Sequence, residues 1–499
     1  MTFSSTRRFC GGALVVVALI CLSSCAVPLA PGYQIEKQSI TVRFVSGNPP
    51  HLAIRGEYRL ANVGTTPLDS VEIDLPDEKG YGRENLHIKI DGREVAAQRE
   101  LNQAPEADVA SSESAPSVWR IPFASRWARR QSKTLLIEYN LAAHVTTDPR
   151  ISVGSNAFYL NDSGWFPAPL PLKALFATNI ARPNPSDLIV DVPANFVATA
   201  SGVSRGTRKQ RSETVHRFRL GKDDPDPFVA AGAYQQQPVS APGGTVSFWT
   251  LQSFPSATLQ ETAKDLASTD VFVTKTFGTI LRANEPLLIV QAPSLDQNSA
   301  AASLDNDLPS LPDAVLFSPS SFSQEASAGT GAGIFERRLA LLWFEHAIRP
   351  RPEAWLLGDS LAAYVVTLAN ENSGATPGRG DFIRERLTRF DQLRDKAVEK
   401  PMAFLAPGDP PQQREIAAAK STLFVFALEG KCGRENLEHA IAHMVYALRG
   451  QEYGYNDFRA ALEQECHQDL SSVFATWLDQ KGIPADFRAR YEKAGGSTK

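Results

Sequence analysis

The chain has 499 residues, a formal net charge of −4 and 43% hydrophobic residues. This composition is typical of folded globular protein and excludes a mostly disordered chain, a collagen-like chain and a membrane protein with many spans. At roughly 100–200 residues per domain, the length corresponds to about two to four domains. A protein that binds nucleic acid through its phosphates carries a basic excess, which this chain lacks, so we expect no nucleic-acid partner.

The first 25 residues have the pattern of an export signal. Two arginines precede an apolar run, Ala13–Leu22, which is too short to span a bilayer because a spanning helix takes about 20 apolar residues. The run leads into the letters LSSC, which end at Cys25 and resemble the lipobox of bacterial lipoproteins, where the cysteine is lipidated and becomes the new N-terminus. We therefore expect a lipoprotein signal peptide over 1–25 and a tether over 26–38. A plain secretory signal with a chance cysteine is the alternative.

The expected anchor also predicts a location. No second long apolar run follows, so the membrane partner would be reached through lipid on Cys25. The next residue is Ala26, whereas Asp at this place is the usual inner-membrane retention signal of Gram-negative lipoproteins. We expect a lipid-anchored protein of the bacterial cell envelope that faces the periplasm, with the outer membrane favoured.

Export affects the interpretation of the two cysteines outside the signal, Cys432 and Cys466, because exported proteins mature in an oxidising compartment. A disulfide between them would close a loop of 34 positions. In the loop-entropy treatment, such a bond stabilises the fold by roughly 3 kcal/mol. Two buried free thiols fit the sequence equally well, so both possibilities stay open here.

The periodicity of apolar residues changes along the chain. Over 39–253, short stretches alternate apolar and polar residues, as in ITVRF at 40–44 and VHRFRL at 215–220, which predicts strands with one face in water. We expect an antiparallel, sandwich-like β domain there. Over 254–380, helical spacing alternates with buried strands, and 381–499 is nearly all helical. The predicted fold class is therefore a β domain followed by an α+β and then an α-helical part.

Several short motifs occur together in an order that is similar to one enzyme family. They are GWFP at 164–167, AGAY at 231–234, TFG at 276–278, FATWL at 474–478 and GIP at 482–484. Their order resembles the membrane alanyl aminopeptidase family of zinc metallopeptidases, the gluzincins of the aminopeptidase N type. The resemblance covers roughly residues 40–490. It implies that the α+β part is a thermolysin-like, mostly helical peptidase-type domain.

The family's chemistry uses a helix with the pattern H-E-x-x-H, whose histidines hold zinc and whose glutamate activates the zinc-bound water. By the resemblance, Arg337 and Leu341 stand at the histidine positions and Arg338 at the general base. Asp359 stands at the third ligand, with one extra residue before it, and Ala418 at the tyrosine that stabilises the transition state. Guanidinium has no lone pair for a metal and leucine has no donor atom, so the resemblance implies a lost zinc site.

The two arginines stand beside a carboxylate in this alignment. We predict an ion pair of Arg337 or Arg338 with Asp359 that fills the former metal position. The alternative is that both arginines point to solvent or pair with Glu336 and Glu345.

Two further sets of residues are candidates for binding. The letters ASLDN, with Asp305 and Asn306, resemble the family's G-x-M-E-N loop for the substrate amine, although a plain acidic loop fits as well. His439 and His443 stand four apart on a predicted helix, a spacing that suits zinc. No third ligand is evident beside them, so we expect solvent-facing histidines.

These observations support one main hypothesis and two alternatives. The main hypothesis is a membrane-anchored pseudo-peptidase that binds a peptide or an envelope protein, without catalysis and without a cofactor. The first alternative is an active zinc-dependent aminopeptidase with relocated ligands, the one case in which zinc would be the cofactor. The second alternative is a purely structural envelope lipoprotein.

Overall fold

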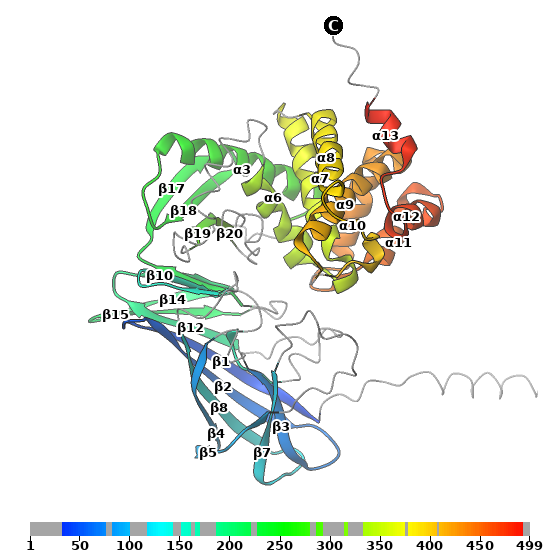
Figure 1. The fold of residues 1–499 in the computed structure, drawn as a ribbon. Coiled ribbons are helices and arrows are strands. Elements are labelled where there is room, and N and C mark those ends of the chain that lie inside the picture. The colour runs from blue at the N-terminus through cyan, green and yellow to red at the C-terminus, as the bar shows by residue number, and fades with distance from the viewer. Residues whose placement is uncertain are drawn as a thin grey trace, which may run out of the picture.

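A computed structural model gives the fold. It describes residues 32–75, 82–99, 117–142, 151–160, 165–169, 186–220, 227–279, 286–292, 314–317, 333–374, 378–406 and 409–492. Figure 1 shows a region of β-sheets built from the first half of the chain and a helical region built from the second half. This arrangement confirms the predicted order of a β domain followed by a mostly helical part.

The largest sheet among the described residues has eight strands, because the long alternating stretches of the first half pair edge to edge. In sheet order its strands are β14 (Val203–Gln210), β15 (Glu213–Arg219), β12 (Ser186–Pro193), β1 (Tyr33–Val45), β2 (His51–Asn62), β8 (Ser132–Ala142), β4 (Arg83–Ile90) and β5 (Arg93–Glu94).

Two smaller sheets complete the β domain in the described part of the chain. One has the order β13 (Val197–Ala200), β16 (Val229–Gly232), β10 (Ala157–Leu160) and β9 (Ile151–Val153). The other has the order β11 (Ala168–Pro169), β3 (Leu68–Leu75), β7 (Ser117–Trp127) and β6 (Gln98–Arg99). Their inward residues share one apolar core with the large sheet.

Two expectations about this domain need correction. The pair β1–β12 is parallel, with Val42 opposite Val190, because alternation of apolar residues reports which face is buried but not the direction of pairing. The first strand also begins earlier than expected, so residues 33–38 belong to the sheet and not to the tether. Tyr33 is buried there, and its hydroxyl donates a hydrogen bond to the Glu72 carbonyl at 3.0 Å.

Two strands that we expected in the β domain belong to a fourth sheet. It contains β17 (Gln235–Ala241), β18 (Gly244–Thr250), β19 (Leu287–Gln291) and β20 (Val315–Phe317), and the pairs β18–β19 and β19–β20 are parallel. Residues 235–250, which we expected to lie with 39–253, therefore pack with the α+β part. A small apolar cluster that includes Tyr159, Phe228 and Leu316 joins this sheet to the β domain.

The second half of the chain is mainly helical. Its elements are α3 (Ser256–Phe277), α6 (Ile334–Leu341), the π-helical turn η2 (Leu342–Ala347), η3 (Pro352–Ala354), α7 (Trp355–Ser373), α8 (Arg379–Arg394), η4 (Met402–Phe404), α9 (Pro411–Cys432), α10 (Arg434–Ala447), α11 (Tyr455–Cys466), α12 (Ser471–Asp479) and α13 (Ala485–Glu492). The two short strands β21 (Arg349–Pro350) and β22 (Glu452–Tyr453) pair in parallel.

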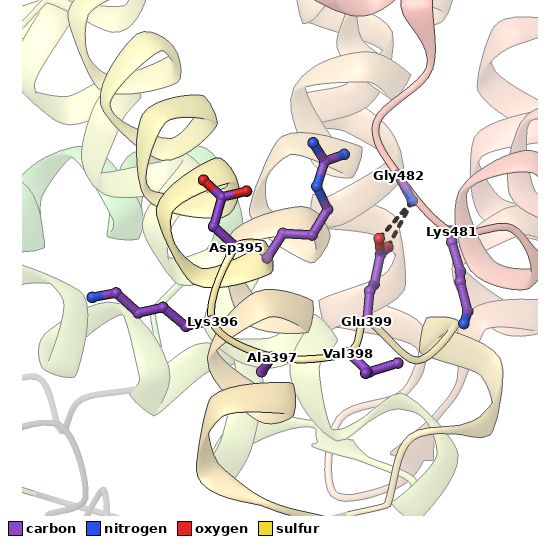
Figure 2. Close-up of a pocket in the computed structure, with 8 residues that line it drawn as sticks. Asp395, Lys396, Ala397, Val398, Glu399, Lys481 and Gly482 are labelled. Atoms are coloured by element: carbon purple, nitrogen blue, oxygen red, sulfur yellow. Dashed lines mark hydrogen bonds between the residues drawn. The ribbon is translucent and has the colours of Figure 1, made fainter.

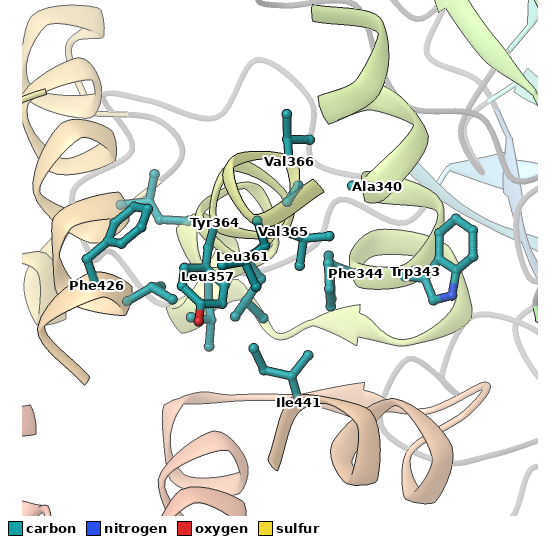
Figure 3. Close-up of a cluster of buried hydrophobic side chains, with 14 of the residues drawn as sticks. Ala340, Trp343, Phe344, Leu357, Leu361, Tyr364, Val365, Val366, Phe426 and Ile441 are labelled. Carbon is teal, nitrogen blue, oxygen red and sulfur yellow. The ribbon is translucent and has the colours of Figure 1, made fainter. Parts of the chain in front are cut away.

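Helix α7 lies at the centre of the helical core. It is buried along most of its length, and its side chains pack between Phe344 of the π-helical turn and Phe426 of α9, with Ile441 of α10 beside them (Figure 3). Because α7 is surrounded in this way, a residue near its start is held firmly against α6. None of the helices in the described part of the chain is long and apolar enough to cross a membrane.

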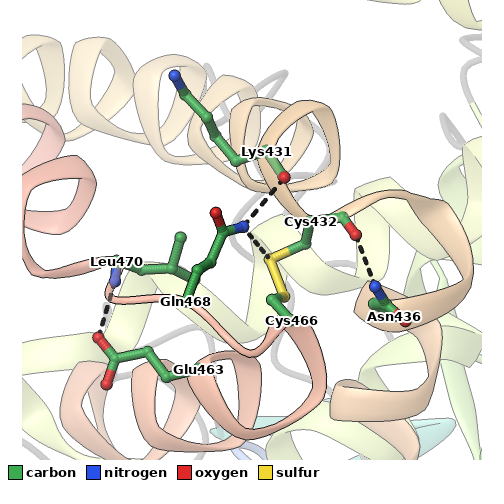
Figure 4. The surroundings of a disulfide bond; sticks show 7 residues. All are labelled: Lys431, Cys432, Asn436, Glu463, Cys466, Gln468 and Leu470. Atoms are coloured by element: carbon green, nitrogen blue, oxygen red, sulfur yellow. Dashed lines mark hydrogen bonds between the residues drawn. A yellow bond between two sulfur atoms is a disulfide. The ribbon is translucent and has the colours of Figure 1, made fainter.

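A disulfide links the ends of α9 and α11. Cys432 and Cys466 are bonded, with their Cα atoms 5.2 Å apart (Figure 4). The side-chain amide of Gln468 donates to the Lys431 carbonyl at 3.1 Å beside the bond. Of the two possibilities left open by the sequence, the structure therefore contains the disulfide.

Candidate functional site

The candidate site lies where α6 faces the start of α7. Arg337 and Leu341 are both half-buried on α6, one turn apart on the same face. Opposite them, Asp359 follows Gly358 on α7. A Cβ atom at Gly358 would lie 3.0 Å from the Phe344 carbonyl oxygen, so glycine at this position lets α7 approach the π-helical turn closely. This close packing brings Asp359 within reach of α6.

Arg337 and Asp359 form a two-point ion pair. Arg337 Nε donates to Asp359 Oδ1 at 2.7 Å, and Arg337 Nη2 donates to Asp359 Oδ2. The two side chains are 30% and 27% exposed, so the pair is partly shielded from water. Bidentate pairing of guanidinium with carboxylate is the strongest common geometry for such groups. The ion pair predicted from the sequence is present, and it involves Arg337.

Arg338, the other predicted partner of Asp359, lies elsewhere. Its side chain is 7% exposed, and its Nη1 donates to the Leu316 carbonyl of β20 at 2.8 Å. Successive helical residues point about 100° apart, so the neighbour of Arg337 faces the mixed sheet instead of α7. The position that the resemblance assigns to the general base therefore carries a cation that hydrogen-bonds the backbone.

The Arg337 side of the pair is held in its charged form. Burial disfavours the Arg337 cation, but the charge and hydrogen bonds of Asp359, together with the charge of Glu345, outweigh this effect and place the pKa of Arg337 above its ordinary value. Arg337 is therefore a cation at neutral pH. Both oxygens of Asp359 accept its hydrogen bonds.

These residues do not fit the zinc ion that the resemblance implies. A protonated guanidinium has no free lone pair and repels a divalent cation, and Leu341 contributes only hydrocarbon. Asp359 already has a bound cation, so a metal would have to displace Arg337. Within the described residues, no three His, Cys, Asp or Glu side chains are grouped closely enough to hold a metal ion together.

A second cation, Arg386 of α8, adds to this site and was missed in the sequence. Its guanidinium lies over the Phe382 ring at 5.0 Å, and its Nε is buried with no hydrogen-bond partner within the described residues. Burial, and then the charge of Arg337, lowers the pKa of Arg386, while Asp359 acts in the opposite direction. Arg386 is therefore a second cation within electrostatic range of Arg337 and Asp359. Arg386 belongs to no motif, so only the packing of α8 could reveal it.

The remaining predicted residues are spread over the molecule. Ala418 is half-buried on α9, where its methyl group has no hydrogen-bonding capacity. His439 and His443 are both exposed on α10, in agreement with the solvent-facing interpretation. Cys25 and the pair Asp305 and Asn306 lie outside the described residues, so their predicted roles stay predictions.

An open pocket of about 660 Å³ lies at a different place, between the end of α8 and the loop before α13 (Figure 2). At its base, Glu399 accepts two hydrogen bonds of 2.8 Å from the Gly482 amide and one of 3.2 Å from Lys420. Burial lowers the pKa of Lys420, and Glu399 opposes that effect. This buried ion pair ties α9 to two loops and is separate from the arginine site.

Comparison with known proteins adds information on the fold. Neither protein-family models nor curated protein sequences match the chain. Among solved structures, the M1 zinc metallopeptidase from Deinococcus radiodurans is similar, with a TM-score of 0.59 and 13% identity over 91% of this chain and 95% of that one. A variant of that enzyme bound to a Tyr-Ser-Ala substrate gives the same values.

A second solved structure supports the same conclusion. The leukotriene A4 hydrolase from Saccharomyces cerevisiae matches with a TM-score of 0.60 and 15% identity over 91% of this chain and 69% of that one. At these identities the similarity concerns the fold. The chain therefore has the two-domain, gluzincin-type fold of the M1 zinc metallopeptidases.

Proposed function

We propose that this protein is an exported, lipid-anchored pseudo-peptidase that binds a peptide or a protein segment without hydrolysing it. The proposal includes its place in the cell envelope, on the periplasmic side, held by lipid on Cys25. The observation that carries it is the ion pair of Arg337 with Asp359, which joins two residues that the resemblance assigns to positions of zinc ligands. Hydrolysis through a zinc-bound water needs several metal ligands and a base, whereas this set of side chains supplies one carboxylate, Asp359, which is already paired with Arg337.

The fold supports a role in peptide binding. The similar Deinococcus enzyme is described with a bound tripeptide, so the same arrangement of domains can hold a short peptide. The charges at the site differ from those of an enzyme that binds a free amine, because the resemblance places the cation Arg337 where a metal ligand is expected and a second cation, Arg386, lies within electrostatic range of it. We infer that Arg386, which is half-buried and has no ion-pair partner within the described residues, presents its guanidinium to a carboxylate of the bound peptide.

The first experiment asks whether a peptide binds and stays intact. The purified chain is titrated with Tyr-Ser-Ala and with a mixed peptide library by isothermal calorimetry, in the presence of added zinc. The masses of the peptides are then determined by mass spectrometry. We expect binding with no loss of peptide. Cleavage would overturn the proposal in favour of an active enzyme, and the absence of any binding would overturn it in favour of a structural role.

A pair of variants tests the site assigned to the ligand. Arg386→Gln removes the guanidinium that would meet the carboxylate, and we expect affinity to fall about 10-fold, as for a lost charge-assisted hydrogen bond. Arg389→Gln, on the same helix, is the control because Arg389 is exposed and already pairs with Glu415 at 2.7 Å. Equal affinities of the two variants would show that the peptide binds elsewhere.

A further inference from the structure

Three exposed arginines lie at one end of the β domain. Arg126 precedes the last residue of β7, and Arg129 and Arg130 form the turn between β7 and β8. All three side chains are exposed, and within the described residues none of them has an ion-pair partner. We call these residues the arginine turn.

Backbone hydrogen bonds fix the arginine turn beside the start of the β domain. The Arg130 amide donates to the Asn62 carbonyl at 2.8 Å, and the Asn62 amide donates to the Gln131 carbonyl at 3.1 Å. The next two amides, 63–64, both donate to the carbonyl of Gly32, at 3.0 and 2.8 Å. The arginine turn and the first described residue of the chain are therefore bound to the same short segment.

The position of Gly32 links the arginine turn to the expected anchor. Gly32 is seven positions after Cys25. A fully extended chain spans at most about 3.6 Å per residue, so Gly32 lies within about 25 Å of the Cys25 backbone. If Cys25 carries lipid, this end of the β domain is held close to the membrane surface.

The surroundings leave the positive charge of the turn uncompensated. Two carboxylates on neighbouring strands are already paired with other arginines: Glu36 with Arg59 at 2.9 Å, and Asp69 with Arg120 at 3.5 Å. Val63, next to the turn, is 50% exposed, which adds an apolar side chain to the same surface. A cationic surface with an exposed apolar residue suits the headgroup layer of a membrane.

We propose that Arg126, Arg129 and Arg130 dock this end of the β domain onto anionic phospholipid headgroups and so fix which end of the domain faces the membrane. The proposal rests on the lipid anchor of the proposed function. Basic residues near an anionic leaflet favour contact about 5-fold each, so the three arginines favour the docked orientation roughly 100-fold.

A second cationic segment provides a matched control. The hairpin of β14 and β15 carries Arg205, Arg208, Lys209 and Arg211, all exposed and without an ion-pair partner in the described structure. Its tip is level with the far end of β1, because Glu213 pairs with Pro193 on β12, the parallel neighbour of β1. With a rise of about 3.3 Å per residue, the tip is about 40 Å from Gly32 along the strands. This distance exceeds the Debye length of about 8 Å in physiological salt, so the tip does not share the field of the arginine turn.

The test attaches the chain to vesicles without relying on lipidation in the cell. The chain from residue 25 to 499 is coupled through its Cys25 thiol to a maleimide lipid, in vesicles of phosphatidylcholine alone or with phosphatidylglycerol. Hydrogen exchange of backbone amides is then followed by mass spectrometry. We expect exchange at residues 128–132 to slow at least 5-fold on the anionic vesicles only, with no change at residues 203–213.

Variants complete the test. The triple substitution Arg126→Gln, Arg129→Gln and Arg130→Gln removes the protection, whereas Arg205→Gln with Arg208→Gln and Arg211→Gln leaves it intact. Thermal unfolding of each variant shows that the exposed substitutions preserve the fold. Protection of the hairpin in place of the turn, equal protection on neutral vesicles, or no protection at either place would overturn the proposal.

A separate measurement addresses the anchor itself. The intact mass of the protein isolated from membranes shows whether Cys25 carries acyl groups. An unmodified cysteine would contradict the lipid anchor of the proposed function but would not alter the vesicle result.

Discussion

A few exchanges of residue type on α6 change the chemistry that the fold can perform. On α6, a guanidinium and a leucine side chain stand on the face where the resemblance places two imidazoles, and Asp359 of α7 binds the guanidinium with both of its oxygens. The negative charge of Asp359, which a metal site would need, therefore neutralises the Arg337 cation. The pair keeps α6 and α7 together where a metal would otherwise bridge them.

This interaction should be measurable as a coupling energy. In a double-mutant cycle of Arg337→Gln and Asp359→Asn, followed by urea unfolding, we expect a coupling of about 1–2 kcal/mol, since both side chains are partly shielded and the pair is bidentate. The exposed pair Arg384 and Asp381 on α8 is the control, with an expected coupling below about 0.5 kcal/mol. Equal coupling energies in the two cycles would mean that the Arg337–Asp359 pair stabilises the fold no more than an exposed ion pair does.

The arginines also show what sequence reasoning can and cannot predict at this scale. The pairing of Arg337 with Asp359 was predictable because both residues occupy positions that converge on one point in the resembling fold. The contact of Arg338 with the Leu316 carbonyl was not, since it depends on how α6 sits against β20. Arg386 gave no signal at all because its relation to Arg337 arises only when α8 and α6 both pack against α7.

At the scale of elements, the disulfide holds two helices of the C-terminal part together. It joins the end of α9 to the end of α11 across 34 positions of the chain. Replacing both Cys432 and Cys466 with serine should lower the free energy of unfolding by about 3 kcal/mol, because the unfolded chain regains the freedom that the closed loop removes. Urea unfolding of the variant and the parent measures this difference. An unchanged urea midpoint would contradict the expectation. As a control, mass spectrometry of the parent without reductant confirms that the disulfide is present in the sample.

A carboxylate on α8 makes the docking of α13 depend on pH. Asp391 accepts hydrogen bonds from Arg488 Nη1 at 2.9 Å and Nη2 at 2.6 Å, and chiefly these bonds lower the pKa of Asp391. A carboxyl group with a lower pKa in the folded state stabilises the fold above its unfolded pKa of about 3.9, and this contribution is lost as the pH falls through the folded pKa.

The corresponding variant is Asp391→Asn. Because the Asp391 side chain is 40% exposed, we expect it to cost only about 0.5–1 kcal/mol at pH 6. The difference between variant and parent should shrink as the pH falls below about 4, where the parent also loses the charge. Urea unfolding at a series of pH values measures the free energy of unfolding of variant and parent. A difference between them that stays constant down to pH 3 would contradict the stabilising role of the Asp391 charge.

The pairing of strands marks the limit of prediction for these elements. The alternation in VSFWT at 246–250 was sufficient to predict a strand, but the same alternation fits an outer strand of the β domain and a strand of the mixed sheet. The parallel pairing of β1 with β12 joins segments more than a hundred residues apart and leaves no local trace. Periodicity therefore predicts which residues are buried, and tertiary packing decides which sheet receives them.

At the scale of the whole molecule, the chain has the M1 two-domain fold, and its described residues include no group of three His, Cys, Asp or Glu side chains that could hold a metal ion. The order of short motifs along the chain was enough to predict this architecture, although the motifs lie both within elements, as FATWL does in α12, and between them, as GIP does before α13. The fold retains its large helical core around α7, so the loss of metal ligands on α6 leaves the surrounding packing intact. On this account the protein is a binding protein built on the framework of a peptidase.

The most direct test of this account is zinc analysis combined with an activity assay. The purified full chain is dialysed against a zinc-containing buffer and then against metal-free buffer, its zinc content is measured by mass spectrometry, and aminoacyl test substrates are added. The account predicts no zinc retained in proportion to protein and no release of an N-terminal amino acid. Two results together would contradict it: the parent chain retains one zinc ion and hydrolyses the test substrates, and the Asp359→Ala variant loses both the zinc and the hydrolysis.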